Sequence, residues 1–203
     1  SYSHITNDQL IHKLFWGSDI HTLIIHSSTL PVTHDNGDSD RQQFWNMPME
    51  EVVITALPAI PDNAFEANSN LKLLVMRRDD ALRSIGEEAF IDCENLHDVK
   101  FSSALANETV TLGKNAFNNT GFVTIGDEDA QFELNAAKFD ANAGYVFTNM
   151  QKLTNVHIPD NFNNGIVPEG TFANAAELKE VTVAPNVDTI KNAAFANDNK
   201  LER

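Results

Sequence analysis

One pattern of apolar positions recurs along most of the chain and predicts the same structural unit each time. An Ala-Phe pair, or a close variant of it, repeats with spacings of 25, 27, 30, 25 and 23 residues, and its Phe is Phe65, Phe90, Phe117, Phe147, Phe172 or Phe195. In most copies an apolar residue lies five positions before this Phe, and others lie six, nine and eleven positions after it. Apolar columns in register over five or six copies indicate a repeat protein.

The segment that follows each Phe predicts a short β-strand. Residues 96–101, Leu-x-x-Val-x-Phe, end in the apolar–polar alternation of a half-buried strand. Such strands, stacked about 4.8 Å apart, form a parallel sheet with one shared core. The Ala-Phe segment is then the opposite wall, where each Phe fills the interior of its coil. We expect seven strands, centred near Leu23, Val52, Leu74, Val99, Ile125, Val156 and Val181.

The two ends of the chain follow the pattern less closely. Weaker copies use Leu14 and Phe44 as wall residues, and we expect the residues before about Ile20 to cap the N-terminal edge. The last copy stops at residues 201–203, where its strand should begin. We therefore expect the natural protein to continue beyond this point.

The spacing of 30 residues after Phe117 indicates an insertion. It covers Gly126 to Asn142, and Asp127 stands where the strand requires an apolar side chain. We therefore expect a distorted strand here. The insertion contains three large apolar residues, so we expect an outward excursion that packs on the wall: Phe132, Leu134 and Phe139.

Composition and charge narrow the class of partner. The chain has 203 residues, of which 42% are hydrophobic, as expected of a globular protein with a substantial core. It has 14 Lys and Arg residues and 29 Asp and Glu residues, which give a net charge of −15. Binding to phosphates requires clustered basic residues, so nucleic acid and anionic membranes are poor partners. We expect a monomer, since charge of one sign keeps proteins soluble and apart.

The repeat resembles the BspA-like, or Treponema-type, leucine-rich repeats, whose consensus is roughly Ile-Gly-x-x-Ala-Phe-x-x-Cys-x-x-Leu-x-x-Ile-x-Ile-Pro. Residues 85–96 read Ile-Gly-Glu-Glu-Ala-Phe-Ile-Asp-Cys-Glu-Asn-Leu, and Ile158-Pro159 supplies the terminal Pro. The resemblance implies an α/β repeat solenoid: a right-handed coil with a parallel concave β-sheet and a short helical or irregular convex wall. We expect an N-terminal cap with a degenerate first repeat over residues 1–43, and one continuous solenoid over residues 44–203.

The resemblance also implies a function and a location. Family members look like cell-surface or secreted proteins of host-associated microbes that adhere to host proteins or to other cells. We therefore expect a non-enzymatic protein-binding or adhesion module whose partner is a host extracellular protein or another cell-surface protein. A structural spacer that presents another domain is the main alternative. A glycan-processing enzyme is a third.

No group of residues predicts catalysis, and we expect no enzyme and no cofactor. Cys93 is the single cysteine, and His97 four residues later makes a Cys–His pair worth weighing. However, the column of Cys93 points inward, and a buried free Cys behaves as a small hydrophobic residue. A structural role for Cys93 is therefore the favoured interpretation.

Candidate metal ligands are also weak, and we expect no metal site. Five of the seven histidines precede residue 35, namely His4, His12, His21, His26 and His34. Zinc requires three or four converging ligands, whereas His21 and His26 point to opposite sides of a strand. Residues 35–40, Asp-Asn-Gly-Asp-Ser-Asp, carry oxygen ligands that suit Ca²⁺ but lack the bidentate Glu and the spacing of an EF-hand loop. A solvated acidic turn is favoured there and at residues 127–129.

The outward side chains of the strands form the candidate binding surface. Since side chains alternate along a strand, the residues that flank each core position face away from the core. The first three strands place four apolar residues there, Ile24, Val53, Leu73 and Val75. Either a partner or the chain's own first residues, including Leu10, Ile11, Phe15 and Trp16, would cover them. With their polar neighbours, the candidate binding residues are Ile24, His26, Glu51, Val53, Leu73, Val75 and Arg77.

Overall fold

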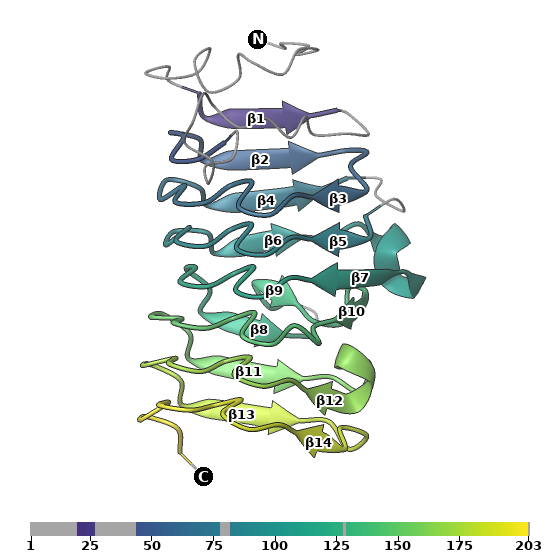
Figure 1. Ribbon diagram of the computed structural model, residues 1–203, viewed down its shortest axis with the longest axis vertical. Helices are drawn as coiled ribbons and strands as arrows, with labels where there is room; N and C mark the ends of the chain where they lie inside the picture. Colours follow the sequence, from purple (N-terminus) through teal and green to yellow (C-terminus); the bar gives the residue numbers. More distant parts are fainter. Residues whose placement is uncertain (1–19, 27–43, 78–81, 128, 203) are drawn as a thin grey trace.

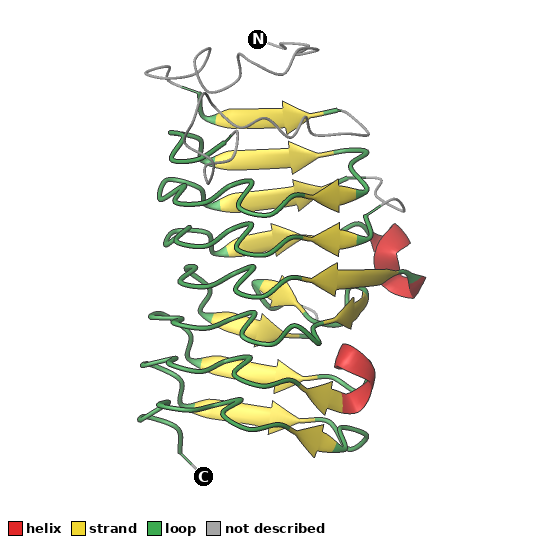
Figure 2. Cartoon of the chain, viewed as in Figure 1, coloured by secondary structure: helices red, strands yellow, loops and turns green. Residues whose placement is uncertain are grey.

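The computed structural model describes residues 20–26, 44–77, 82–127 and 129–202, and in this part of the chain it shows stacked coils without an α-helix (Figures 1 and 2). Eight strands form one main sheet, in which every pair of neighbours is parallel. This architecture confirms the repeat solenoid. In spatial order the strands are β1 (Thr22–Ile25), β2 (Glu51–Ile54), β4 (Leu73–Met76), β6 (Asp98–Lys100), β9 (Phe132–Glu133), β8 (Thr124–Gly126), β11 (Asn155–Ile158) and β13 (Glu180–Val183).

All seven expected strands are present in the main sheet, each at the predicted position. β1 pairs with β2 in register, so the degenerate first repeat contributes a strand to the solenoid. Leu14 and the residues predicted to cap the N-terminal edge lie outside the described residues. The boundary between residues 1–43 and 44–203 remains a prediction.

A second row of short strands lies beside the main sheet and points the other way in Figure 1. Except for β10, these strands contain the apolar residue that precedes a wall Phe by five positions, such as Ile60 or Ile85. Two 3₁₀-helices connect main-sheet strands to strands of the second row: η1 (Ser103–Asn107) follows β6, and η2 (Phe162–Gly165) follows β11. The second row comprises a four-stranded sheet, β10 (Lys138–Asp140), β7 (Thr109–Leu112), β5 (Ser84–Ile85) and β3 (Ala59–Ile60), and a pair, β12 (Ile166–Val167) and β14 (Thr189–Ile190).

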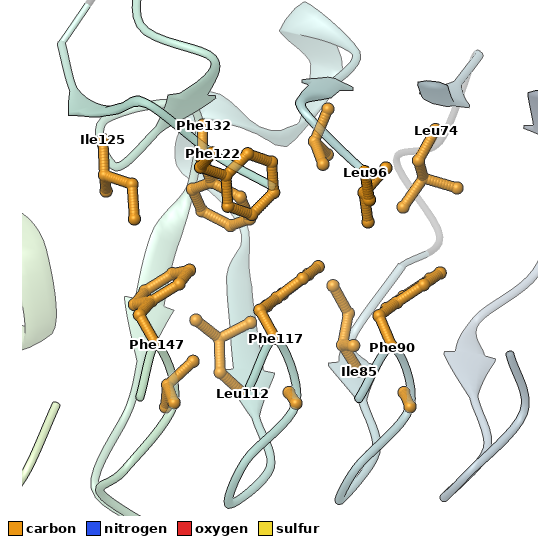
Figure 3. Close-up of a cluster of buried hydrophobic side chains, with 14 of the residues drawn as sticks. Leu74, Ile85, Phe90, Leu96, Leu112, Phe117, Phe122, Ile125, Phe132 and Phe147 are labelled. Carbon is orange, nitrogen blue, oxygen red and sulfur yellow. The ribbon is translucent and has the colours of Figure 1, made fainter. Parts of the chain in front are cut away.

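The wall Phe residues form a continuous stack through the core. Consecutive rings from Phe44 to Phe195 lie nearly parallel, with centroids 5.1 to 5.7 Å apart. Figure 3 shows three of them, Phe90, Phe117 and Phe147, in a row opposite the side chains of the main sheet. All are buried except Phe195, which is partly buried. The prediction that each Phe fills the interior of its coil is confirmed from Phe65 to Phe172, and Phe195 is the least buried member of the column.

The irregular wall is held by backbone hydrogen bonds between coils. The residues two positions before and two after each Phe from Phe65 to Phe195 adopt left-handed dihedrals, for example Glu88 (φ 55°) and Asp92 (φ 59°) around Phe90. The N–H groups of these three residues donate to carbonyl groups of the next coil at 2.8 to 3.0 Å. Asn tolerates this conformation better than most residues, which explains its frequent presence just after the Phe. The side chains of those Asn residues also form a ladder of hydrogen bonds, from Asn197 through Asn174 and Asn149 to Asn118.

The prediction of an outward excursion between Gly126 and Asn142 is wrong. β9 lies inside the main sheet, where Phe132 pairs with Val99 of β6 and Ile125 of β8, so the sheet has eight described strands instead of seven. β10 extends the second row beside β7. The three large apolar residues of the insertion, Phe132, Leu134 and Phe139, are 0 to 2% exposed, and Figure 3 places Phe132 in the core. Apolar side chains at alternate positions fit a strand, and burying them in the shared core releases more apolar surface from water than packing outside the wall.

Candidate binding surface

The exposed face of the main sheet carries an apolar patch on its first strands, which we define as Ile24, Val53, Leu73 and Val75. Strand register places Ile24, Val53 and Val75 side by side across β1, β2 and β4. Ile24 is 46% exposed, Leu73 and Val75 are half-buried, and Val53 is only 4% exposed. The accessible apolar surface of the patch therefore comes from Ile24, Leu73 and Val75.

Polar residues border the apolar patch. The hydroxyl of Thr22 donates to Glu51 at 3.2 Å across β1 and β2. His26 Nδ1 lies 2.5 Å from the Thr55 hydroxyl, and these two residues directly follow β1 and β2. Arg77 is exposed at the end of β4. The structure thus places all seven predicted binding residues on three neighbouring strands or directly after them, with Glu51 and His26 in cross-strand hydrogen bonds.

Polar side chains replace the apolar ones on the later strands. At the position of Val75, β6 carries Lys100, which pairs with Asp98 at 2.8 Å. The hydrogen bond to Asp98 raises the pKa of the Lys100 ammonium group. β11 and β13 place His157 and Thr182 at the equivalent positions. The exposed face therefore has an apolar N-terminal half and a polar C-terminal half.

A hollow of about 350 Å³ lies on the polar half, over β8, β11 and β13. It exists because β8 ends at Gly126 and the following residues, including Asp127, Asp129 and Ala130, turn outward to form a rim. A side chain at Gly126 would collide with His157, since a Cβ atom there would lie 2.9 Å from the Cβ of His157. Sequence reasoning identified the outward residues of these strands but missed the hollow, for which the polar Asp127 in an apolar column was the available signal.

His157 connects the rim of the hollow to its floor. Its Nε2 lies 2.9 Å from Asp127 Oδ2, and its Nδ1 lies 2.6 Å from the Thr182 hydroxyl. A carboxylate, an imidazole and a hydroxyl in series are the parts of a nucleophilic triad. The same cross-strand His–Thr pair recurs at His26 and Thr55, however, so it is a packing feature of neighbouring parallel strands. The hollow mainly offers carboxylate, amide and hydroxyl oxygens, which suit hydrogen-bond donors of a partner.

Cys93 is a core residue. Its side chain is fully buried and its Sγ donates to the carbonyl of Phe65 at 3.1 Å. Burial raises the pKa of its thiol well above the usual value. His97 is exposed, with Nδ1 2.8 Å from the carbonyl of Asn95, so the Cys–His pair weighed from the sequence is not formed.

Among the described residues, no three His, Cys, Asp or Glu side chains gather in a way that could hold a metal ion. His4, His12, His34 and the acidic stretch at residues 35–40 lie outside the described residues. In the described part of the chain, no helix is long and apolar enough to cross a membrane.

The repeat units match a known family model. The model of the BspA type leucine-rich repeat region matches six copies, over residues 37–123 and 58–202. The chain belongs to this family. Leucine-rich-repeat domains are typically non-enzymatic scaffolds, and they generally bind proteins.

A solved structure agrees on the fold. A leucine-rich repeat protein from Bacteroides ovatus is 20% identical, with a TM-score of 0.61 over 90% of this chain and 44% of that one. The BspA-type chain therefore spans less than half of that protein's length. A leucine-rich repeat protein from T. pallidum is 16% identical, with a TM-score of 0.46 over 70% of this chain and 72% of that one. No curated protein matches the chain.

Proposed function

We propose that this chain is the protein-binding module of a cell-surface or secreted adhesion protein, and that it binds through the exposed face of the main sheet. The apolar patch is the observation that supports this proposal. A sheet face that only contacts water is expected to be polar, as the later strands are with Lys100, His157 and Thr182. Exposed apolar side chains gathered on adjacent strands are typical of interaction sites.

The patch has the composition of the centre of a protein interface. Such interfaces combine an apolar centre with a polar rim, and a few buried anchors contribute most of the affinity. Ile24 and Val75 supply the apolar centre, while His26, Glu51 and Arg77 supply hydrogen-bonding and charged groups at its border. The adhesion role and the cell-surface location rest on the family resemblance.

Binding can be measured on a panel of immobilised extracellular-matrix and cell-surface glycoproteins by biolayer interferometry. We expect saturable binding to at least one of them. The double variant Ile24→Asp with Val75→Asp should weaken it at least tenfold, because two charges would enter the apolar centre. The matched control is Thr182→Asp, which places a carboxylate at the equivalent position of β13 and should leave the affinity unchanged.

Two results would count against the proposal. If both variants bind as the unmodified chain does, the binding site lies on another surface. If the unmodified chain binds no member of the panel, the structural spacer becomes the better interpretation. The melting temperature of each variant must stay within a few degrees of the unmodified chain for the comparison to hold.

A further inference from the structure

The third residue after each wall Phe lies inside the coil, and in three copies its side chain donates hydrogen bonds to Phe carbonyl groups. The Asn68 amide donates to the carbonyl groups of Phe44 at 2.6 Å and Phe65 at 2.7 Å. Cys93 donates to the carbonyl of Phe65 at 3.1 Å, and the hydroxyl of Thr120 donates to the Phe carbonyl of its own coil at 3.0 Å. Where a polar residue occupies this buried column, the structure therefore uses it as a donor.

Asp198 occupies the same column, three residues after Phe195, and is 9% exposed. Its Oδ1 accepts from the N–H of Ala175 at 2.7 Å, just as Asn68 Oδ1 accepts from the N–H of Met47 at 2.5 Å. The other oxygen, Oδ2, corresponds to the donating nitrogen of Asn68. Oδ2 is buried and has no hydrogen-bond partner among the described residues.

The chemistry of this position favours a neutral carboxyl group. An ionised carboxylate can only accept hydrogen bonds, whereas a protonated one has an O–H to donate. An ionised Oδ2 in this column would face carbonyl oxygens, and a buried acceptor without a donor destabilises the folded state. A proton on Oδ2 supplies the donor that Asn68 supplies with its amide.

We propose that the Asp198 carboxyl group is a proton-dependent latch on the C-terminal coil of the described chain. In its protonated form, Oδ2–H donates to the Phe carbonyl groups of this column and joins the turn after Phe195 to the coil of Phe172. In its ionised form the donor is lost, and the buried charge favours opening of that turn. Only a proton is exchanged with water, and no other bond changes.

The electrostatic surroundings agree with this assignment. Burial raises the pKa of Asp198 from 3.8 to about 6, against the opposing effect of the Ala175 N–H. The charged residues of the two turns that pack together here do not offset this rise in the pKa. Glu177 and Lys200 pair with each other at 2.6 Å. Lys179 and Glu202 are the other charged residues of these turns among the described residues. Because the folded pKa lies above 3.8, the stabilisation is full below pH 3.8 and is lost as the pH rises to about 6.

Hydrogen exchange and carbon NMR on the whole chain test the latch at pH 4.5 and pH 7. The amides of Leu201 and Glu202 report the turn, since they donate to the carbonyl groups of Asp198 and Lys179. After correction for intrinsic exchange, we expect the opening constant of this turn to rise about tenfold between the two pH values. Between these two pH values the shift of the pKa from 3.8 to about 6 allows at most about a 25-fold change, and water at the exposed coil screens part of it. The Asp198 carboxyl carbon should titrate near pH 6.

Two variants complete the design. Asp198→Asn keeps the shape and supplies a permanent donor, so it should protect the turn equally at both pH values. Asp188→Asn removes an exposed carboxylate from the same coil and should keep the pH dependence of the unmodified chain. Titration of the Asp198 carboxyl carbon near pH 4, or an unchanged pH dependence in Asp198→Asn, would overturn the proposal.

Discussion

The backbone N–H of Leu134 lies 2.6 Å from the carbonyl oxygen of Gly126, so the chain returns to the end of β8 shortly after leaving it. The side chain of Leu134 is fully buried, whereas Asp127, which follows Gly126 directly, turns outward to His157. Leu134 thus supplies the apolar side chain that the repeat requires after β8. Two strands, β8 and β9, follow the single wall residue Phe117, and residues of the loop between them form the rim of the polar hollow.

Leu134 fills the core position that the repeat pattern assigns to Asp127, and replacing Leu134 tests whether its burial there stabilises the fold. Leu134→Ala should reduce the free energy of unfolding by about 2–5 kcal/mol, the range for a buried Leu in a packed core. Urea denaturation followed by circular dichroism measures the loss. Lys138→Ala, at an exposed position of the same insertion, is the control and should change stability by less than about 0.5 kcal/mol. Equal effects of the two variants would mean that the insertion is not part of the core.

The Phe stack predicts a graded response along the solenoid. Phe90→Ala should cost roughly 3–5 kcal/mol, because Phe90 is fully buried between the rings of Phe65 and Phe117. Phe195→Ala should cost less, since Phe195 is only partly buried and stacks on Phe172. Denaturant melts of both variants check the order. A loss below about 1 kcal/mol for Phe90→Ala would contradict its place in the core.

The parts of the fold that could be predicted are those with a repeated local signal. The main-sheet strands show apolar–polar alternation in nearly every copy, so their positions and register were predictable. The second row was missed because strands such as β5 contain one apolar residue, Ile85, and alternation needs several. The placement of β9 depends on competition between Leu134 and Asp127 for one core position, which only the assembled structure resolves.

The candidate site was predictable to the same extent. The outward direction of Ile24, Val53 and Val75 follows from the strand period alone. The burial of Val53 does not, because it depends on everything that packs around the face. The hollow was missed for a similar reason, since it depends on the path of the chain after Gly126.

The unequal exposure within the apolar patch predicts unequal effects on stability. Val53→Asp should destabilise the fold by about 2 kcal/mol or more, because Val53 is 4% exposed and a buried carboxylate lacks hydration. Ile24→Asp should change stability by less than about 1 kcal/mol, because Ile24 is 46% exposed. Thermal melting of both variants measures the difference. A shift of many degrees for Ile24→Asp would show that the patch is covered within the chain, which would remove the support for the proposed binding site.

Asn68 offers a test of the column in an internal coil. Asn68→Asp keeps the shape of the side chain but replaces the amide that donates to the carbonyl groups of Phe44 and Phe65. The new carboxyl group would be fully buried, so its folded pKa should lie above the ordinary value. Its destabilising effect should therefore be small near pH 4 and grow as the pH rises, to about 3 kcal/mol at pH 7. Urea denaturation at pH 4.5 and pH 7 measures this difference, with Asn68→Ala as the control that cannot titrate. If the two variants lose the same stability at both pH values, Asn68 fills space in the column and its donated hydrogen bonds contribute little.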